Sequence, residues 1–560
     1  MNRGVSLMGR GAIRWGVLLV VVLTMGACSS SDDPAEVADV SGAWEFFYTE
    51  TAAGDDYGPI RMEIVQSGGT VDLTLFPPGE APITGSGTTG GTEILMNIDA
   101  LGDLTDVTLD GTVAVDEMFG SWTAAGGRTG SWEAFRAADG GAVVLINLGD
   151  SLTNGIQSYA VNEFTQSFGY TQVLAEQMAE AVPLFWNNPL LTRFETRIDP
   201  DLIPYNLGVD GATTQEVIVE RTGSGNPLLD ELLAPLPERA GRSLSQLEAA
   251  EYLADLYPNQ TKVFTLWIGN NDVLGAVTRD FGSRLTEADI LDYLSDTEAG
   301  HDLDAVEANL SEIVDRLAAF PDSHVFVANI PYVTQIGFLF NEADLERLAA
   351  FPQADVTSLA PGQSVGFGPV LNPDNPDQSI ARGLGLDNFS LNGLIFGTVS
   401  ASDGFSLTAE EAVLINNRVD AINDHIAFLA RTHSNVTLVD TNALFQEVID
   451  EEIVIAGDVL YKTLGGGVFS LDGVHPSDTG YALVANEFIR TINFSDLNLR
   501  IPEADVEAVW AADPYIDGDG DFYVDGPDPA TISPLLVPLI DCDDTDPDVV
   551  APYVSGTICF

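Results

Sequence analysis

The stretch Leu145 to Gly155, LINLGDSLTNG, is an apolar run that ends in Gly149-Asp150-Ser151 and opens into a turn of small residues. An apolar run of this length, bounded by a turn, is typical of a fully buried strand, and we expect one from Ala142 to Leu148. Open α/β folds place their ligand sites at the carboxyl ends of parallel strands. Because Ser151 follows directly after the expected strand, its hydroxyl group is a candidate nucleophile.

Strands and helices alternate from this run to about Asn493. We expect helices at Leu247 to Leu256 and at Asp304 to Phe320. Another helix is expected after Thr408, because Thr408 and Glu411 can form a capping box and apolar residues then recur every three or four positions. This alternation predicts a parallel sheet covered by helices on both faces, which is an α/β fold. The other expected strands are Ile203–Leu207, Val263–Gly269, Val325–Ile330 and Val436–Asp440.

Two connections are longer than such a sheet needs. They run from Val273 to Gly300 and from Tyr332 to Ser406, and the second is rich in Pro, Gly, Asn and Phe. Long insertions beside the carboxyl ends of strands form lids or substrate walls, although packing without a direct role is an equally good interpretation. The stretches IGFLF (336–340) and NGLIFG (392–397) favour acyl chains over sugars as ligands of such a wall.

The region from about Val40 to Ala137 has a different pattern. Short runs of alternating apolar and polar residues, from GAWEFFYTE (42–50) to GSWEAFRA (130–137), are separated by Gly and Asp turns. This pattern predicts a small β-barrel or β-sandwich at residues 40–137. The region contains no histidine and no catalytic constellation, so a spacer or a binding module is the expected role.

The charge of the chain is strongly negative. Among 560 residues, 85 are Asp or Glu and 22 are Lys or Arg, which gives a net charge of −63. Such a surface repels nucleic acid and anionic membranes, and it argues against a DNA-binding role. The length predicts two or more domains. Because the acidity is spread along the chain, it points to no particular site.

Residues 1–28 have the pattern of an export signal. Arginines at positions 3, 10 and 14 precede the apolar run WGVLLVVVLTMGAC, which is too short for a membrane span and suits a signal peptide. Met25-Gly26-Ala27-Cys28 resembles a bacterial lipobox, in which Cys28 is lipidated; a secreted protein cut nearby is the alternative. Residues 29–39 would then be a tether. We expect an exported protein of the bacterial cell envelope, anchored by lipid in the outer membrane or at the surface.

A serine nucleophile needs a base, an orienting group and donors for the oxyanion. Of the five histidines, His475 has the most suitable context, FSLDGVHPSDTGYALVANEF (469–488). Asp472 precedes it by three residues and could orient the imidazole, Pro476 fixes the turn, and Ser477 can cap the following helix. The remaining histidines are expected to have structural roles: His301, His324, His425 and His433.

GDSLTNG (149–155) and DGVHP (472–476) together resemble the GDSL lipases and esterases of the SGNH hydrolase superfamily. In this superfamily, four sequence blocks supply Ser, Gly, Asn and His. YNLGVDGATT (205–214) resembles the second block and LWIGNND (266–272) the third. The resemblance covers residues 141–495 and implies a flavodoxin-like three-layer α/β/α core. It places Gly211 and Asn271 in the oxyanion hole, with Asn270 as the neighbour that could be confused with Asn271.

The reaction implied by these residues is acyl transfer to water, without a cofactor. His475 would take the proton of Ser151 as this residue attacks an ester carbonyl. The N–H groups of Ser151 and Gly211 and the side-chain amide of Asn271 would hold the oxyanion. Asp150 could be mistaken for the orienting acid, but we expect it to support the turn through backbone hydrogen bonds.

Several functions remain open. A serine esterase or lipase is the leading interpretation, and an O-acetyl carbohydrate deacetylase would use the same residues. A surface binding or adhesion protein could keep a vestigial hydrolase core. The superfamily also includes phospholipases, thioesterases and arylesterases, and no residue in the sequence distinguishes among them.

Residues 513–560 form a separate Asp-rich tail. Its first acidic residues alternate with glycines that allow a tight wrap, and hard oxygen ligands at this spacing suit Ca²⁺. The tail lacks the closing Glu of an EF-hand and resembles Asp-rich calcium repeats of the thrombospondin type 3 kind; an acidic tail without metal is the alternative. The spacing and the resemblance together give these candidate ligands: Asp517, Asp519, Asp521, Asp541, Asp543 and Asp544.

The chain has three cysteines. If Cys28 carries lipid, Cys542 and Cys559 remain as an even pair near the C-terminus. An exported compartment would let this pair form a disulfide, and the resemblance of the tail likewise places Cys542 in one. A catalytic cysteine is therefore not expected.

Overall fold

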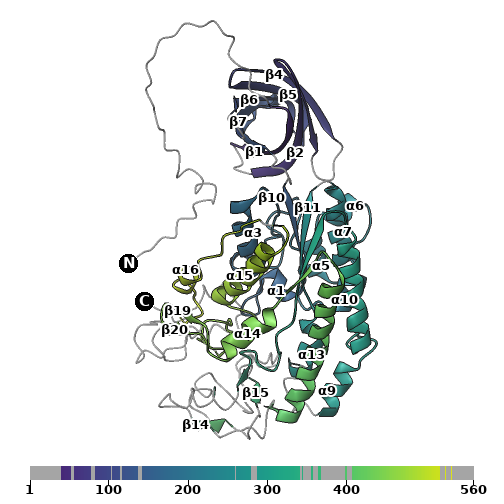
Figure 1. Cartoon of the computed structure of the whole chain (residues 1–560), viewed down its shortest axis with the longest axis vertical. Helices are drawn as coiled ribbons and strands as arrows, with labels where there is room; N and C mark the ends of the chain where they lie inside the picture. Colours follow the sequence, from purple (N-terminus) through teal and green to yellow (C-terminus); the bar gives the residue numbers. More distant parts are fainter. Residues whose placement is uncertain are drawn as a thin grey trace.

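The computed structural model of the chain has two parts, an N-terminal barrel and a larger α/β domain (Figure 1). The described residues are 40–136, with gaps at 52–55, 77–81, 103 and 114–116; 142–344, with gaps at 259, 279–286 and 341–343; short pieces of 345–405; 406–517, with gaps at 464 and 498; and Val524 and Thr531.

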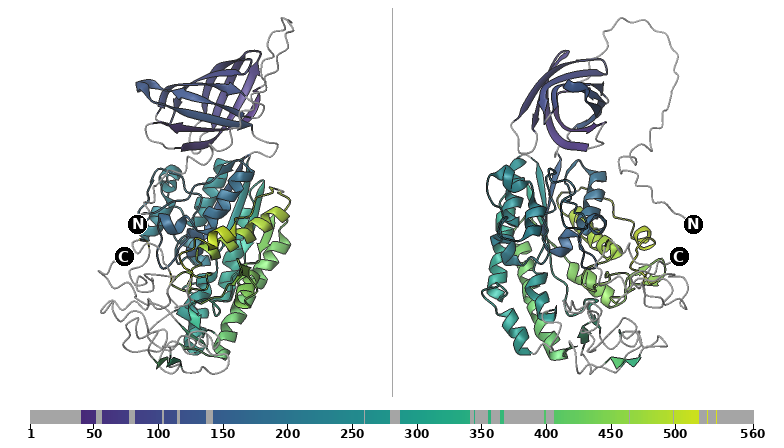
Figure 2. Two further views of the ribbon diagram at one scale, coloured as in Figure 1. Left: turned by 90° about the vertical axis from the view of Figure 1, so that its left-hand side faces the viewer. Right: turned by 180° about the vertical axis from the view of Figure 1, so that it is seen from behind.

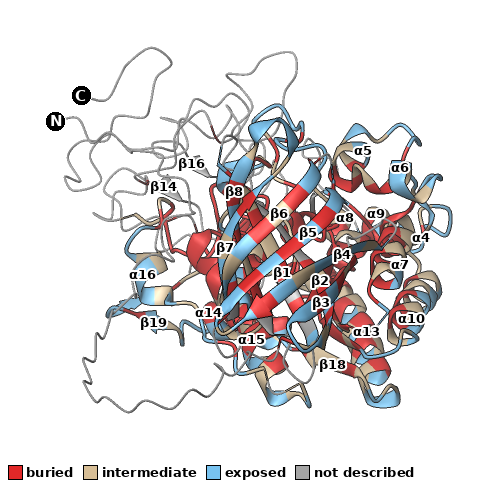
Figure 3. Cartoon of the chain, turned by 90° about the horizontal axis from the view of Figure 1, so that it is seen from above, coloured by how far each residue is buried: buried red, intermediate tan, exposed pale blue. Residues whose placement is uncertain are grey.

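The N-terminal part is a closed barrel of antiparallel strands, in which β1 pairs with β8. Side chains alternate between the interior and the solvent, as the alternating colours along the strands show (Figure 3). Apolar side chains fill the interior, and Trp44, Trp122 and Trp132 are each at most 2% exposed. The region is therefore a barrel and not a sandwich. Its strands are β1 Gly42–Glu50, β2 Asp56–Ser67, β3 Thr70–Phe76, β4 Ile83–Gly90, β5 Glu93–Leu101, β6 Leu104–Val113, β7 Glu117–Thr123 and β8 Thr129–Arg136.

The strand β4, ITGSGTTG, lies where the apolar pattern indicated no strand. Its glycines stand very close to the backbone of β5. A Cβ atom at Gly87 would lie 2.1 Å from the carbonyl oxygen of Leu95, and one at Gly85 would lie 2.5 Å from that of Asn97. Glycine in a strand often marks such a close approach of backbones. At β4, the sequence therefore shows glycines that allow a close approach of two backbones, in place of an alternating apolar pattern.

Five parallel strands form the central sheet of the second part, in the order β10-β9-β11-β12-β18. Numbered along the chain, this order is 2-1-3-4-5, that of flavodoxin-like folds, so the expected α/β architecture is confirmed. Four of the strands begin and end within two residues of the expected positions. The bounds are β9 Val143–Gly149, β10 Leu184–Phe185, β11 Thr261–Trp267, β12 Ser323–Ala328 and β18 Val436–Val439.

The expected strand at Ile203–Leu207 is wrong as a strand of the sheet. The chain is extended there and bonds to β9, with the amide of Leu207 2.9 Å from the carbonyl oxygen of Asn147. It forms only an isolated bridge, at Asn206, and β10 is the strand that pairs beside β9. Pro204 explains part of the difference, because proline has no N–H group to donate to a ladder.

Helices cover both faces of the sheet (Figures 1 and 2). One layer contains α3 (Tyr170–Ala181), α14 (Thr441–Ile449) and α15 (Asp478–Phe494). The other contains α4 (Thr214–Val219), α7 (Gln246–Leu256), α10 (Leu303–Ala318) and α13 (Ala409–Thr432). The capping box of Thr408 and Glu411 at the start of α13 is present. The other helices that the structure describes are short: α1 Ser151–Asn154, α2 Glu163–Gln166, α5 Pro227–Leu233, α6 Leu236–Ala240, α8 Asn270–Thr278, α9 Glu287–Leu294 and α16 Val506–Trp510.

The two long connections contribute differently to the fold. The first contains most of α8 and all of α9, whereas most of the second lies outside the described residues. Ile336, Phe338 and Leu339 of IGFLF are at most 6% exposed, so this stretch packs mainly into the core. NGLIFG lies outside the described residues. The short strands of this region and of a following hairpin are β13 Leu339–Phe340, β14 Asp355–Val356, β15 Ser364–Gly366, β16 Thr398–Val399, β17 Ser406–Leu407, β19 Val454–Ile455 and β20 Asp458–Val459.

The barrel joins the α/β domain at the amino ends of the sheet strands. β8 ends at Arg136 and β9 begins at Val143, so only a short connection separates them. Figures 1 and 2 show the barrel at that end of the molecule. Because the five strands are parallel, their carboxyl ends lie at the opposite end. Within the described part of the chain, no helix has the length and apolar character needed to cross a bilayer.

Candidate active site

Ser151 is the first residue of α1 and follows β9 after a sharp turn. The turn requires glycine at position 149, because a Cβ atom there would lie 2.1 Å from Oγ1 of Thr153 and 2.4 Å from the carbonyl oxygen of Trp267. Asp150 caps α1, with its Oδ1 accepting the amide hydrogen of Leu152 at 3.0 Å. Ser151 thus lies at the carboxyl edge of the sheet, beside β11, where the strand order reverses and ligands bind in such folds.

The structure brings Ser151, His475 and Asp472 together. Oγ of Ser151 lies 3.0 Å from Nε2 of His475, and Nδ1 of His475 lies 2.8 Å from Oδ2 of Asp472. Ser151 and His475 are each 7% exposed, and Asp472 is fully buried. A hydroxyl group bonded to a base that is itself oriented by a third group has the geometry of an activated nucleophile.

The loop that carries Asp472 and His475 is fixed by its own backbone. Oδ1 of Asp472 accepts the amide hydrogens of Val474 and His475, both at 2.8 Å. Two residues after His475, Oγ of Ser477 accepts the amide hydrogen of Gly480 at 3.1 Å and caps α15, as the sequence predicts. The imidazole therefore stands directly before a long, well-anchored helix.

Neighbouring charges set the ionisation of the acid and the base. Burial is the largest single influence on both groups, and it favours their neutral forms. For Asp472, the charge and hydrogen bonds of His475 outweigh burial, so the pKa of this carboxyl group lies below its usual value. For His475, the charge and hydrogen bond of Asp472, together with the charges of Asp210 and Asp150, outweigh burial and raise the imidazole pKa above 6.5.

Gly211 and Asn271 lie on neighbouring loops at the same edge as Ser151. The side-chain amide of Asn271 donates to the carbonyl oxygen of Ala212 at 3.1 Å, which ties the two loops together. Gly211 is exposed and has a φ of 72°, a left-handed conformation that favours glycine. Its amide donates to the carboxylate of Asp210.

Asp150 and Asn270 connect the turn of the nucleophile with the loop after β11. Nδ2 of Asn270 donates to Oδ2 of Asp150 at 3.1 Å. Asp150 is fully buried, and burial raises its pKa to about 7 against the effect of these hydrogen bonds. Asp150 therefore supports the turn, and its side-chain partner is Asn270 and not Asn271.

A comparison with models of protein families matches residues 145–488 to the GDSL-like Lipase/Acylhydrolase family. The match covers more than half of the 560 residues. The chain belongs to the GDSL-like lipase/acylhydrolase family. In the general sense of that family, the protein is a hydrolase of esters. A search of curated proteins found no match.

Several solved structures are similar to parts of this GDSL-like hydrolase. The extracellular lipase from Streptomyces rimosus is 14% identical, with a TM-score of 0.31, over 63% of this chain and 98% of that one. Phospholipase A1 from Streptomyces albidoflavus NA297 is 15% identical, with a TM-score of 0.30, over 63% and 98% of the two chains. A redesigned β-barrel is 17% identical, with a TM-score of 0.15, over 18% and 92%. Likenesses at these TM-scores carry no argument about the reaction.

Two contacts around the site of this GDSL-like hydrolase were not predicted from the sequence. Asp272 is fully buried and accepts the amide and hydroxyl hydrogens of Thr214 at 3.0 and 2.8 Å, which adds a second tie between the loops of Gly211 and Asn271. The position of Asp272 directly after the asparagines was a signal for this role. The amide of Tyr159 donates to Oδ2 of Asp472 at 2.8 Å, and no sequence pattern pointed to that contact.

The other histidines do not belong to the hydrogen-bonded series of Ser151, His475 and Asp472. His425 bonds to the hydroxyl of Ser311 at 2.9 Å, and His433 bonds to Asp315 at 2.9 Å, both between α10 and the α13 region. The ring of His301 packs on that of Tyr293 with centroids 4.2 Å apart. These contacts agree with the structural roles expected for them.

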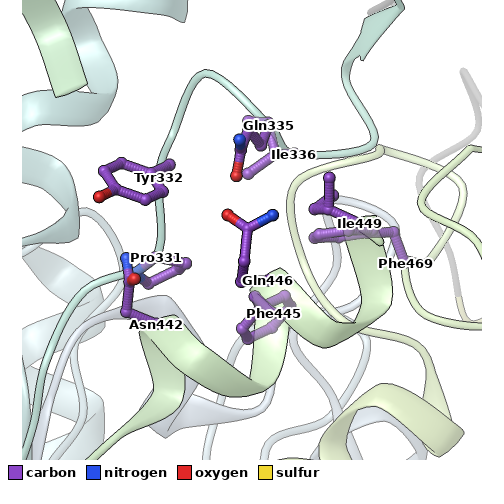
Figure 4. A pocket seen from close by; sticks show the side chains of 9 residues that line it. All are labelled: Pro331, Tyr332, Gln335, Ile336, Asn442, Phe445, Gln446, Ile449 and Phe469. Carbon is purple, nitrogen blue, oxygen red and sulfur yellow. The ribbon is translucent and has the colours of Figure 1, made fainter. Parts of the chain in front are cut away.

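A small pocket opens at the same edge of the sheet, between the loop after β12 and α14 (Figure 4). The amides of Gln335 and Gln446 face one another across it. Phe469, on its wall, bridges to Pro476 in the loop of His475. Ser151 and His475 do not line this pocket, so the hydrogen-bonded residues define the candidate site and the pocket does not.

The remaining predicted residues lie mostly outside the described part of the chain. Cys28, Cys542 and Cys559 all do, as do five of the expected calcium ligands, Asp519, Asp521, Asp541, Asp543 and Asp544. Asp517 is described, and its amide donates to the carbonyl oxygen of Gly465 at 3.2 Å. Among the described residues, no three His, Cys, Asp or Glu side chains gather as a metal site would require.

Proposed function

We propose that the protein hydrolyses carboxylic esters through an acyl-enzyme on Ser151. The observation that carries the proposal is the continuous series of hydrogen bonds from Oγ of Ser151 through His475 to Asp472. Buried polar groups reduce stability unless they are paired. A binding protein with a vestigial hydrolase core has no reason to keep this buried series intact, whereas a serine hydrolase depends on it.

In the first half of the reaction, Nε2 of His475 takes the hydroxyl proton while Oγ of Ser151 bonds to the ester carbonyl carbon. The carbonyl oxygen takes up the negative charge. When the adduct collapses, the bond between carbon and the alcohol oxygen breaks, and the proton passes from His475 to that oxygen. Asp472 remains charged and stabilises the imidazolium. Water then repeats the sequence on the acyl-enzyme and releases the acid.

Three N–H groups would donate hydrogen bonds to the oxyanion. The side-chain amide of Asn271 has two N–H bonds, of which one donates to Ala212, so the other is available to the oxyanion. The amide of Gly211 would exchange its bond to the Asp210 carboxylate for one to the oxyanion. The amide of Ser151 would be the third donor. Donors fixed in this way stabilise the transition state because they need little reorganisation.

Two substrate classes are compatible with the proposed chemistry. A lipase or esterase is the leading candidate, and an O-acetyl carbohydrate deacetylase on the same site is the alternative. The described residues give no acyl-binding wall that separates the two.

The test is hydrolysis of nitrophenyl acetate, butyrate and decanoate by the full-length protein in mild detergent. It is run beside Ser151→Ala and, as a matched control, Ser295→Ala, which removes an exposed serine at the end of α9. Loss of activity in Ser151→Ala alone supports the serine hydrolase, and equal rates in all three proteins refute it. Hydrolysis of decanoate supports a lipase or esterase, whereas activity confined to acetate supports a deacetylase.

We also propose that lipid on Cys28 anchors the protein in the cell envelope, on the basis of the lipobox-like Met25-Gly26-Ala27-Cys28. Labelling of expressing cells with radioactive palmitate should mark the protein, and Cys28→Ala should abolish the label. Label that persists in this variant would contradict the assignment.

We propose further that the Asp-rich tail binds Ca²⁺, because its alternating carboxylates are the hard oxygen ligands that this ion prefers. Addition of Ca²⁺, but not of Mg²⁺ at equal concentration, should protect the tail of the full chain from limited proteolysis. Cleavage at the same rate in both would exclude a calcium-dependent structure. In the calcium-bound tail, Cys542 and Cys559 would be joined by a disulfide, which mass spectrometry of the non-reduced protein can detect.

A further inference from the structure

The turn from Gln157 to Ala160 (the Gln157–Ala160 turn) lies against the catalytic loop and has a strained backbone conformation. Gln157 and Ala160 exchange both backbone hydrogen bonds, at 3.1 and 2.9 Å. Between them, Ser158 and Tyr159 have φ angles of 51° and 54°. These angles lie in the left-handed region of the backbone, which residues other than glycine rarely adopt. Such a conformation is unfavourable and persists only where surrounding contacts impose it.

Those contacts come from the loop of His475. The amide of Ser158 donates to Oγ of Ser470 at 2.8 Å, and Oγ of Ser158 accepts the amide hydrogen of Leu471 at 3.2 Å. The amide of Tyr159 donates to Oδ2 of Asp472, the same oxygen that bonds to His475. The turn and the catalytic loop therefore form one hydrogen-bonded unit.

The turn is held from its other side as well. The side chain of Gln157 donates to Asp478 at 2.7 Å, at the start of α15, and that of Asn162 donates to the carbonyl oxygen of Thr531 at 2.7 Å. Ser158 is fully buried. With its backbone fixed on both sides, the turn gives the side chain of Tyr159 a defined place.

The ring of Tyr159 lies against the catalytic imidazole and is partly exposed to solvent. Its centroid is 6.3 Å from that of His475 with an interplanar angle of 82°, which is an edge-to-face contact. Tyr159 is 40% exposed, although its neighbours Ser158 and Gln157 are buried. An aromatic ring that is held rigidly beside a reactive group, and is partly open to solvent, is suited to contact a ligand.

The chemistry of ester cleavage identifies which part of the ligand lies there. The alcohol oxygen must receive its proton from Nε2 of His475 as the bond to the carbonyl carbon breaks, so the alcohol group leaves on the imidazole side. The carbonyl oxygen points instead to the loops of Gly211 and Asn271. We propose that Tyr159 forms the wall of the alcohol subsite and determines a preference for esters of aromatic or bulky apolar alcohols. This inference rests on the proposed serine hydrolase function.

The test keeps the acyl group constant and changes the alcohol. Methyl acetate and benzyl acetate release alcohols of similar acidity, so the ratio of their kcat/KM values reports recognition of the alcohol. Tyr159→Ala should lower kcat/KM for benzyl acetate by about 3- to 10-fold, the effect of losing one aromatic contact, and leave methyl acetate within about twofold. Tyr159→Phe keeps the ring and should keep the preference. If the ratio of the kcat/KM values for benzyl and methyl acetate does not change in Tyr159→Ala, Tyr159 does not form the alcohol subsite. If the preference for benzyl acetate falls by the same factor in Tyr159→Phe, the ring is not its cause.

Two further readouts separate this role from a structural one. Tyr159→Phe keeps the packing of the ring on the imidazole, so the acidic limb of the pH profile of kcat/KM, which follows His475, should not move in this variant; a shifted limb would mean that the hydroxyl group acts through the base and would refute the subsite. The ratio of methyl decanoate to methyl acetate should stay constant, because the acyl side is untouched. Phe494→Ala is the control, since this 92% exposed residue ends α15, about 24 Å along the helix from the catalytic loop.

The outcome also remains distinguishable from failure of the proposed function. If Ser151→Ala is as active as the unaltered protein, the serine hydrolase itself is refuted. If Ser151→Ala is inactive and the alcohol ratio does not respond to Tyr159, only the subsite is refuted.

Discussion

Replacement of Asp472 by Asn tests the catalytic assignment most directly, because the structure dictates what the new amide meets. Each carboxylate oxygen of Asp472 accepts two N–H groups: Oδ1 those of Val474 and His475, and Oδ2 those of Tyr159 and the imidazole Nδ1. An Asn side chain has one oxygen and one NH₂ group. Whichever way it is oriented, the NH₂ group therefore faces two donors.

The two orientations differ in free energy. With NH₂ toward the loop backbone, the part-buried amide of Val474 and the buried amide of His475 both lose their acceptor, at about 1–3 kcal/mol each. With NH₂ toward the imidazole, only the amide of Tyr159 loses its acceptor, because His475 can shift its proton to Nε2 and accept at Nδ1. The second orientation should therefore be favoured. The unfolding free energy of Asp472→Asn should then be lower than that of the unaltered protein by about 1–3 kcal/mol. A proton on Nε2 prevents His475 from accepting the proton of Ser151, and the wrong tautomer lowers kcat by about 10⁴.

The assay is nitrophenyl acetate hydrolysis for kcat, with urea unfolding for stability. Asp315→Asn is the matched control, because it breaks a second Asp–His pair, with His433, on an exposed surface of α10. The control should keep kcat within about twofold and lose at most about 1 kcal/mol of stability. A kcat for Asp472→Asn within tenfold of the unaltered protein would refute the orientation of the base by Asp472.

Three further outcomes are expected. Asn271→Ala should lower kcat by about 10²–10³ with little change in melting temperature, since it removes one oxyanion donor; an unchanged kcat would remove Asn271 from the site. The kcat/KM value should rise with pH along a limb whose midpoint lies above 6.5, because neighbouring carboxylates raise the pKa of His475 and only the neutral imidazole acts as base; a midpoint below 6.5 would contradict this. Burial raises the pKa of Asp150 from 3.8 to about 7, so this group stabilises the fold fully below pH 3.8 and loses that contribution as the pH rises to about 7. In Asp150→Asn, the melting temperature should therefore decline less between pH 3.8 and about 7. An unaltered dependence of the melting temperature on pH would show that the buried carboxyl group is not the cause of the decline.

The fold was largely predictable because its strands and helices follow the hydrophobic pattern. The strand that precedes Ser151 and the capping box at Thr408 were both found in this way. The two differences have steric causes. The glycines of β4 replace an apolar pattern with a close approach to β5, and Pro204 limits the pairing of the stretch that was expected to be a strand.

The candidate site was predictable where one short segment carries both partners. Asp472 and His475 are three residues apart, so their contact follows from local spacing. The choice between Asn270 and Asn271 rested on the family resemblance, and the structure adds that Asn270 is engaged with Asp150. The contact of Tyr159 with Asp472 spans 313 residues and depends on a strained turn, so no local pattern could reveal it.

The hydrogen bond between Ser151 and His475 joins residues 324 positions apart. Contacts of such long sequence separation form late in folding, because closing a long loop costs entropy before native contacts offset it. The first strand of the sheet and the loop before its last long helix must both be in place before the two side chains can meet. Recovery of esterase activity after dilution from denaturant would therefore follow the slowest phase of refolding, and would lag behind the return of the circular dichroism signal.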